Sequence, residues 1–239
     1  MQAVNNKIKV VKCFTAMPSD SSAGALVGDI ISMKGWGHCD ILIRAGSAID
    51  ASFAVTIHKG VSVSSAATAL AFTRYLQQGK RLYYTGADGV FTVGETVTGD
   101  SSSTTGKVYK DNGDHLILYD CKVSTPAFTV GEGIDGGSSG FSATVDATQS
   151  GATTHADDEC DLMVPRTATG NTFNILGTTQ VECLYVIPID AALLGDGYDC
   201  IELNTADTGA GTNAYVDAIY ILSEPRYMDQ FGGPSAIVD

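Results

Sequence analysis

Hydrophobic and polar residues alternate with a period of two along much of the chain. The clearest run extends from Ala51 to His58, where Phe53, Val55 and Ile57 share one face and polar residues occupy the other. Successive side chains of a β-strand point to opposite faces, so this spacing is typical of a strand with one buried side. The run therefore predicts a half-buried strand.

Similar runs recur before and after this strand, with clusters of Gly, Ser, Asn and Asp between them. They are Ile8 to Phe14, Asp29 to Met33, Cys39 to Arg44, Thr172 to Leu176, Val181 to Ile189, Tyr198 to Thr205 and Tyr215 to Leu222. Short strands separated by turns predict an all-β protein with a β-sandwich or jelly-roll-like base. Only Ala66 to Gln78 and Asp190 to Leu194 are compatible with helical turns, and we expect a strand over Ala69 to Leu76.

The composition changes between Tyr84 and about Ser150, where Gly, Ser, Thr and Asp dominate and large aliphatic residues become fewer. Such a change indicates an inserted module. We therefore predict two domains. Residues 1–85 and 150–239 form a discontinuous β-sandwich base, and residues 86–149 form an inserted tandem β-repeat module.

The module contains an internal repeat. Phe91 to Gly99 matches Phe128 to Gly136 at a separation of 37 positions, and Val108 then falls on Val145. We interpret the match as a duplication. Asn112-Gly113 carries the signal of a hairpin turn. In each copy we expect a strand over Phe-Thr-Val before Gly-Glu, and these features together predict a small, barrel-like β module.

Charge and composition restrict the partners of the chain. The 27 acidic and 14 basic residues give a net charge of −13, which repels phosphate backbones and argues against direct nucleic-acid binding. No segment approaches the roughly 20 apolar residues of a membrane helix. The segment from Met1 to Asn6 lacks the pattern of a secretion signal. We expect no membrane partner and synthesis in the cytoplasm.

The six cysteines are scattered, and no two have C-x-x-C spacing. They are Cys13, Cys39, Cys121, Cys160, Cys183 and Cys200. Several lie in apolar runs that resemble strands, where a free thiol behaves as a small hydrophobic group. We expect buried free thiols, and disulfides remain an alternative for an extracellular particle.

The candidate chemical groups do not form a recognisable site. We interpret His38 and Cys39 as a structural pair, because no second ligand pair has metal-like spacing from them. The acidic segment from His155 to Asp161 lacks the glycine turn of a calcium loop and is read as a solvated loop. No nucleophile elbow, Walker loop or dinucleotide fingerprint occurs. The prediction is a non-enzymatic protein with no catalytic, cofactor-binding or metal-binding residues and no cofactor.

The repeated F-T-V-G-E-x-(V/I)-x-G motif, followed by a loop of Ser, Gly and Thr, resembles the tandem β modules of tailed-bacteriophage virion proteins. The flanking segments Gly28 to Trp36, Cys39 to Ile43 and Tyr215 to Tyr227 resemble a sandwich family of phage head proteins. The resemblance implies a capsid decoration, or cement, protein on the virion surface, assembled in the host cytoplasm. It also implies contacts with the major capsid protein and a homo-oligomer, with a trimer favoured.

Two alternatives remain open from the sequence. The same tandem modules occur in tail and baseplate components. A carbohydrate-binding module is the other alternative, because sandwiches often present aromatic platforms to sugars. The candidate platform residues are Trp36, Tyr83, Tyr84, Tyr198, Tyr215, Tyr220 and Tyr227.

Overall fold

The structure is a computed structural model that describes residues 8–14, 25–45, 52–122, 128–146, 157–176, 183–206 and 216–226. Within these residues the secondary structure consists of β-strands and one short 3-10 helix, which confirms the predicted all-β class. The described part of the chain contains no helix of the length and hydrophobicity needed to cross a bilayer.

The chain divides into two compact units. Unit 1 comprises residues 1–76, 165–177 and 184–239, and unit 2 comprises residues 77–164 and 178–183. The predicted inserted module, residues 86–149, falls within unit 2.

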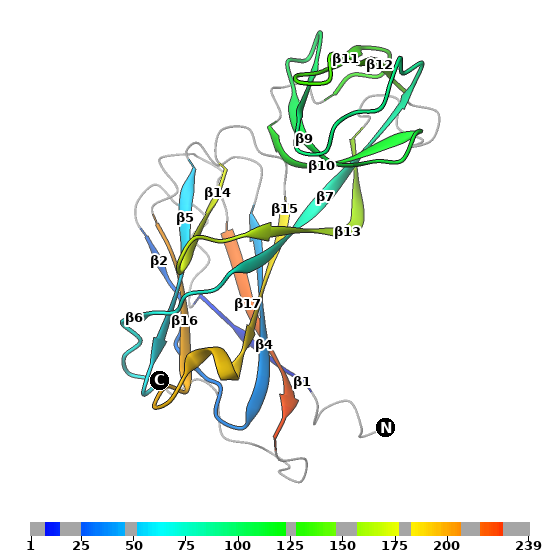
Figure 1. Cartoon of the computed structure of the whole chain (residues 1–239). Helices are drawn as coiled ribbons and strands as arrows, with labels where there is room; N and C mark the ends of the chain where they lie inside the picture. Colours follow the sequence, from blue (N-terminus) through cyan, green and yellow to red (C-terminus); the bar gives the residue numbers. More distant parts are fainter. Residues whose placement is uncertain are drawn as a thin grey trace. The chain divides into compact units, whose positions relative to one another are not determined.

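The strands of unit 1 form two antiparallel sheets (Figure 1). One sheet has the order β1-β17-β4-β15 and the other β14-β5-β16-β2, with β3 on β16 and β6 on β5. Their bounds are β1 Ile8–Lys12, β2 Leu26–Val27, β3 Ile31–Ser32, β4 Trp36–Ala45, β5 Phe53–Gly60, β6 Thr68–Ala69, β14 Thr172–Ile175, β15 Cys183–Asp190, β16 Cys200–Thr205 and β17 Val216–Pro225; the 3-10 helix η1 is Ala191–Leu194.

The two sheets of unit 1 pack face to face, as in a β-sandwich. The hydroxyl of Tyr220 on β17 accepts a hydrogen bond of 2.9 Å from the backbone N–H of Leu203 on β16. The rings of Phe173 on β14 and Tyr185 on β15 lie 5.7 Å apart. Inward positions are aliphatic or aromatic because every second residue of each strand faces the core. The sandwich-like base predicted from the alternation is confirmed.

Unit 2 contains a closed ring of antiparallel strands in the order β7-β10-β9-β8-β11-β12, with β12 pairing back to β7. The bounds are β7 Arg74–Thr85, β8 Thr96–Gly99, β9 Thr105–Asp111, β10 His115–Lys122, β11 Gly133–Gly136 and β12 Ser142–Val145, and β13 is Asp157–Thr167. Closure leaves the ring without an open sheet edge. The predicted barrel-like module is therefore a six-stranded barrel.

The barrel core is small. Its buried members are Leu82, Tyr84, Phe91, Val97, Val108, Leu116, Leu118, Cys121, Phe128, Ile134, Ala143 and Val145. Equivalent positions of the two repeat copies, such as Phe91 and Phe128 or Val108 and Val145, occupy it together. The duplication thus contributes matched core residues from both halves.

Three sequence expectations are wrong in detail. The strand expected over Ala69 to Leu76 is interrupted, because residues 70–73 are not in a strand and β7 begins at Arg74. Phe91-Thr92-Val93 and its second copy precede or enter tight turns instead of forming strands. The acidic segment read as a solvated loop belongs to β13 from Asp157 onward, while residues 155–156 lie outside the described part. Its dense charge and the nearby Pro165 are typical of a loop, so the sequence did not predict the strand.

Candidate functional site

The most developed polar site of the structure lies in the barrel, where a carboxylate of each repeat copy binds the serine loop of the other copy. Glu132 is 7% exposed. Its Oε2 accepts hydrogen bonds from the backbone N–H groups of Ser101 and Ser102, at 3.0 and 2.9 Å, and from the Ser101 hydroxyl at 2.8 Å. Its Oε1 accepts from the Ser102 hydroxyl at 2.8 Å and from the Thr129 N–H at 2.6 Å.

Glu95, 37 positions earlier and 5% exposed, makes the reciprocal set. Its Oε2 accepts from the N–H groups of Ser138 and Ser139, at 3.1 and 2.9 Å, and from the Ser138 hydroxyl at 3.2 Å. Its Oε1 accepts from the Ser139 hydroxyl at 2.9 Å and from the Thr92 N–H at 2.6 Å. We call Glu95, Glu132 and the serine pairs 101–102 and 138–139 the clasp.

The clasp follows an approximate two-fold symmetry. Strands β8 and β11 pair with Val97 opposite Gly136, Thr98 opposite Asp135 and Gly99 opposite Ile134. The shift of 37 positions that relates the repeat copies exchanges the first and last of these pairs. An axis through the Thr98 and Asp135 pair therefore relates the two halves.

Glycine is required where the carboxylates approach the backbone. A Cβ atom on Gly99 would lie 2.5 Å from the Ser102 hydroxyl oxygen and 2.6 Å from Oε1 of Glu132. Gly136 has the equivalent relation to Ser139 and Glu95. These glycines of the F-T-V-G-E-x-(V/I)-x-G motif make room for the clasp.

The clasp carboxylates are suited to binding, not to proton transfer. Burial alone would raise the pKa of both Glu95 and Glu132, but the hydrogen bonds from backbone and hydroxyl donors lower it below the ordinary glutamate value. A general acid or base works best with a pKa near the working pH. Both groups stay ionised near neutral pH and act as fixed acceptors for the opposite loop.

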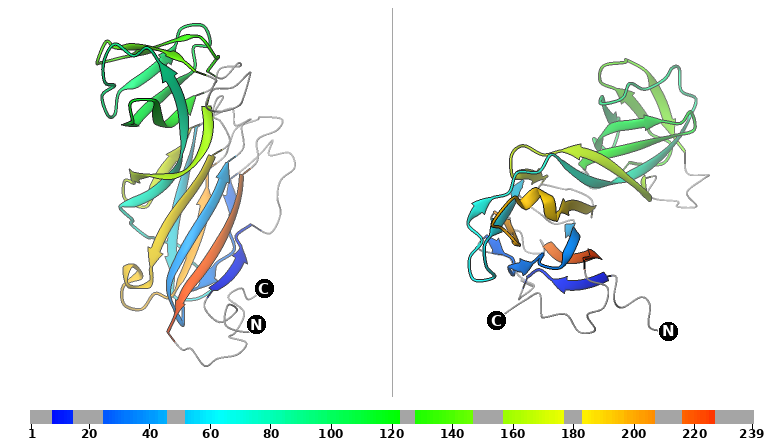
Figure 2. Two further views of the ribbon diagram at one scale, coloured as in Figure 1. Left: turned by 90° about the vertical axis from the view of Figure 1, so that its right-hand side faces the viewer. Right: turned by 60° about the horizontal axis from the view of Figure 1, so that its bottom comes forward.

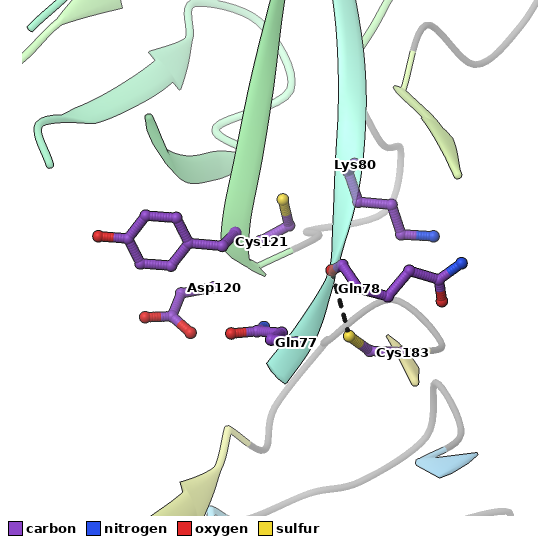
Figure 3. A pocket seen from close by; sticks show the side chains of 7 residues that line it. Gln77, Gln78, Lys80, Asp120, Cys121 and Cys183 are labelled. Carbon is purple, nitrogen blue, oxygen red and sulfur yellow. Dashed lines mark hydrogen bonds between the residues drawn. The ribbon is translucent and has the colours of Figure 1, made fainter. Parts of the chain in front are cut away.

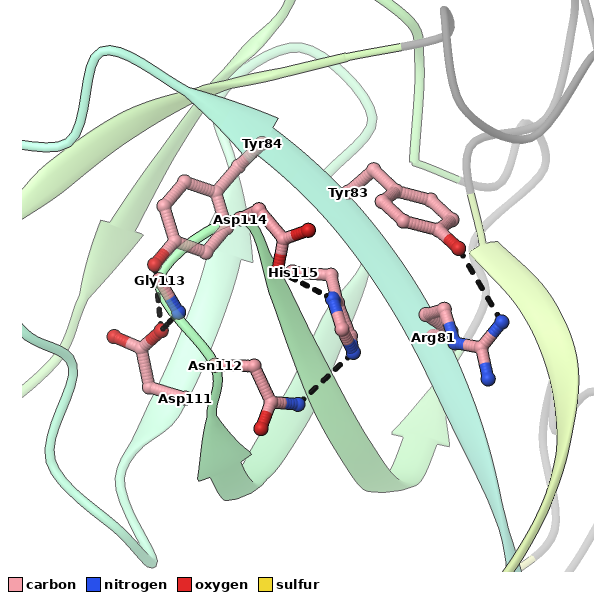
Figure 4. A network of polar contacts seen from close by, with 8 residues as sticks. All are labelled: Arg81, Tyr83, Tyr84, Asp111, Asn112, Gly113, Asp114 and His115. Carbon is pink, nitrogen blue, oxygen red and sulfur yellow. Dashed lines mark hydrogen bonds and ion pairs between the residues drawn. The ribbon is translucent and has the colours of Figure 1, made fainter.

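A second polar network lies around the β9–β10 hairpin (Figure 4). Asp111 accepts hydrogen bonds from the hydroxyl of Tyr84 at 2.5 Å, from the Phe91 N–H at 2.9 Å and from the Gly113 N–H at 2.8 Å. The predicted hairpin is present, but Gly113 and Asp114 form the centre of its turn, and Gly113 has a φ of 89° that glycine adopts readily. Burial and the adjacent Asp111 raise the pKa of Tyr84, which keeps its hydroxyl protonated as a donor. The network fixes the hairpin to β7.

A shallow hollow opens beside β7 and β10 (Figure 3). It is lined by Gln77, Gln78, Lys80, Tyr119, Asp120, Cys121 and Cys183. Asp120 has a φ of 51° at an irregularity in the β9–β10 pairing, and its side chain lies 3.8 Å from the Nζ of Lys107. With its amide turned to suit the carboxylate, Gln77 donates to Asp120 at 3.0 Å. These contacts stabilise the irregularity, which is a β-bulge with a structural role.

His38 and Cys39 do not form the structural pair expected from the sequence. They are neighbours on β4 and point to opposite faces, Cys39 into the core and His38 outward. The His38 ring lies between Asp190, 2.7 Å from Nδ1, and Asp40, 3.1 Å from Nε2. Burial alone would lower the pKa of His38, but these two carboxylates raise it. The pairing partner was missed because Asp190 is distant in sequence.

Among the described cysteine side chains, the expectation of buried free thiols is confirmed. They are Cys13, Cys39, Cys121, Cys183 and Cys200. The side chain of Cys160 lies outside the described part of the chain. Burial raises the pKa of Cys13 to about 12, in contact with the Tyr220 hydroxyl, so this thiol stays protonated. Such thiols are poor nucleophiles.

Two of the suggested aromatic platform residues are buried. Tyr84 is 4% exposed and Tyr220 is fully buried, so neither ring can stack on a sugar. Tyr198 lies under the Nζ of Lys59, 4.2 Å from the ring centre. Tyr215 and Tyr227 lie outside the described residues. The remaining candidates, Trp36 and Tyr83, belong to different units.

Sequence reasoning found the repeat but missed its main contact. The signal was present, because Ser101-Ser102 and Ser138-Ser139 are also separated by 37 positions. Within the described residues, no group of three or more His, Cys, Asp or Glu side chains is placed to hold a metal ion. No protein-family model, curated protein or solved structure matches the chain.

Proposed function

We propose that this chain is a non-enzymatic structural protein of a tailed-phage particle that decorates and stabilises the outer capsid shell through protein–protein contacts. The single observation that supports the structural role is the clasp, in which both buried carboxylates of the barrel bind serine loops and remain ionised. The buried charged groups of the repeat thus serve its architecture.

The placement on a capsid follows from the sequence resemblance. The F-T-V-G-E-x-(V/I)-x-G motif that carries the resemblance is the same segment that supplies the clasp glutamates and glycines. A repeat whose motif glutamates and glycines serve to close a barrel is a reusable module for extending a structural protein. The net charge of −13 keeps such a protein soluble and away from the packaged genome.

Immunogold labelling of intact particles, made from the genome that encodes this chain, tests the proposal. Dense label over the whole shell is expected, and particles lacking the gene should lose their genome at a lower temperature. Label confined to the tail would instead identify a tail or baseplate component. Particles without label would show that the chain is not a virion protein.

A further inference from the structure

The sheet β1-β17-β4-β15 of unit 1 has an unusual outward face. Alternate residues of these strands face the core, and the intervening residues face away from it. A sandwich sheet normally has polar residues on the outward side. Here the outward set includes eight apolar side chains, and we call these eight the apolar face: Ile8, Val10, Leu42, Leu184, Val186, Pro188, Ile219 and Ile221.

The apolar side chains are contiguous across the strands. Ile219 lies opposite Leu42, and Ile221 lies opposite Val10. Ile8 is 48% exposed and Val10 is 61% exposed, while the more central members are half-buried. The left view of Figure 2 shows the four strands side by side, with no other described strand of unit 1 in front of them.

The other sheet of the same unit provides an internal comparison. Its outward side chains on β5, β14 and β16 are mainly polar: Thr56, His58, Thr172, Asn174, Glu202 and Asn204. Several bind one another, since the side-chain amide of Asn204 hydrogen-bonds with His58 at 3.1 Å and donates to Glu202 at 3.0 Å. A polar outward face is therefore present in this unit. The apolar face departs from it, as surfaces that bind another protein do.

The charge of the apolar face suits a second copy of the same chain. The charged residues on these outward positions are Lys12, Arg44, Asp40, Asp190 and Asp217, two cations against three carboxylates, and the ring of His38 lies between Asp40 and Asp190. Arg44 and Asp217 lie opposite one another in register. The whole chain carries −13. Two copies that meet through this face therefore bring little net charge together, despite the negative charge of the whole chain.

The area is sufficient for a weak dimer. Four strands spaced by about 4.8 Å, each with about eight residues rising 3.3 Å, cover about 500 Å² per copy. Two such faces bury about 1,000 Å², which is near the lower limit for a specific protein interface. A flat sheet face also packs readily on another at a spacing of about 10 Å.

We propose that the apolar face is the contact through which two copies of this chain associate, face to face about a two-fold axis. In such an isologous contact the same patch serves both copies, so each apolar residue is buried in both of them. This contact rests on the proposed function as a structural protein and specifies one of its partners, a second copy.

Sedimentation velocity of the full chain at increasing micromolar concentrations tests the contact. The expected species is a dimer of twice 24.9 kDa.

Ile221→Lys places a charge at the centre of the face in both copies and should weaken association by about tenfold or more. Val10→Thr, at an exposed position with retained β-propensity, should weaken it less and tests the face even if Ile221→Lys does not fold. Val61→Lys adds the same charge at a 66% exposed position outside the face and should leave association unchanged.

Salt separates an apolar contact from a charged one, because exposed charges are screened while apolar burial is not. The dimer should persist in high salt. A monomer at all concentrations, an oligomer that keeps its affinity in both face variants, or dissociation by salt would each overturn the proposal. Solution association does not depend on particles. A dimer with no label on particles would therefore overturn the proposed function alone.

Discussion

The barrel of unit 2 and the sandwich of unit 1 are stabilised in different ways. The sandwich packs two sheets around many aliphatic and aromatic side chains, such as Ile57, Ile187 and Tyr220, each fully buried. The barrel has a smaller core and buries more polar side chains: Gln77, Lys80, Glu95, Ser102, Thr104 and Glu132. A small core supplies little hydrophobic stabilisation, so the barrel also depends on directional contacts between its halves.

The difference indicates how each unit responds to change. Hydrophobic packing tolerates substitutions that keep volume and shape. A buried polar network instead requires every partner, because one unmatched donor or acceptor costs its full desolvation. We therefore expect small substitutions to lower the stability of the barrel when they disrupt the clasp. In the sandwich they should lower stability when they disrupt the packing.

The largest expected effect is that of Glu132→Ala. The substitution removes the acceptor of the Ser101 and Ser102 donors and should destabilise the barrel by about 3 kcal/mol. Hydrogen exchange of the barrel amides measures this loss. Trp36, the single tryptophan, lies in unit 1 and reports on the sandwich through its fluorescence. The urea midpoint seen by Trp36 should not move.

Asp135→Ala is the matched control for Glu132→Ala, because Asp135 is an exposed acidic residue on the adjacent strand β11. It should leave barrel exchange almost unchanged. Equal effects of the two substitutions would show that general charge, and not the clasp, stabilises the barrel. A shift of the Trp36 midpoint in Glu132→Ala would show that the two units unfold as one.

Gly99→Ala should have the next largest effect. The new methyl group meets hydrogen-bonded atoms of Ser102 and Glu132, which cannot move without breaking the clasp, and we expect a loss of about 2 kcal/mol. Gly140→Ala in the equivalent turn has open space but a φ of 71°, and it should cost about 1 kcal/mol. Denaturant unfolding monitored by hydrogen exchange of the barrel amides compares the two losses of stability. A smaller loss for Gly99→Ala than for Gly140→Ala would contradict the close approach.

Tyr220→Phe probes the sandwich. It keeps the packed ring and removes only the hydroxyl that accepts from the Leu203 N–H, so it should destabilise unit 1 by about 1 to 2 kcal/mol. The Trp36 fluorescence midpoint in urea measures the change. Hydrogen exchange of the barrel amides should be the same as in the unsubstituted protein. An unchanged midpoint would mean that the Leu203 N–H finds another acceptor.

The smallest effects concern pH, and the two units should respond in opposite directions. The pKa of His38 is raised by Asp190 and Asp40, so its contribution is complete below the ordinary histidine value of about 6.5 and is lost as pH rises through the folded pKa. The clasp pKa values are lowered, so that contribution is complete above the ordinary glutamate range and is lost as pH falls.

An NMR titration of the His38 ring and urea unfolding at several pH values check this sign. His38→Asn should remove the alkaline loss in the sandwich and leave the acid loss in the barrel. A His38 pKa at or below the ordinary histidine value would contradict the arrangement.

The sequence predicted elements better than contacts. Alternation located β5 and β17 because each has one core face and one outward face. The repeat indicated the barrel because matched residues such as Phe91 and Phe128 share one core. By contrast, β13 was missed because its acidic start and Pro165 are typical of a loop.

The site was harder to predict, since its contacts join residues distant in sequence. Glu132 binds serines 31 and 30 positions away, and His38 binds Asp190 at a separation of 152. Local patterns carry no information on such pairs. Only the repeat offered a route, because the serine pairs recur at the same offset as the glutamates.

The reciprocal clasp also limits how the two repeat copies can diverge. Each glutamate fits a loop encoded in the other copy, so a change in either loop alters the environment of a residue in the opposite half. Neither copy can drift freely in this segment without loss to both. The requirement does not extend to the exposed turns between the strands. This accounts for a chain in which Phe-Thr-Val-Gly-Glu and the serine pair both recur after 37 positions, while few positions beyond them still match.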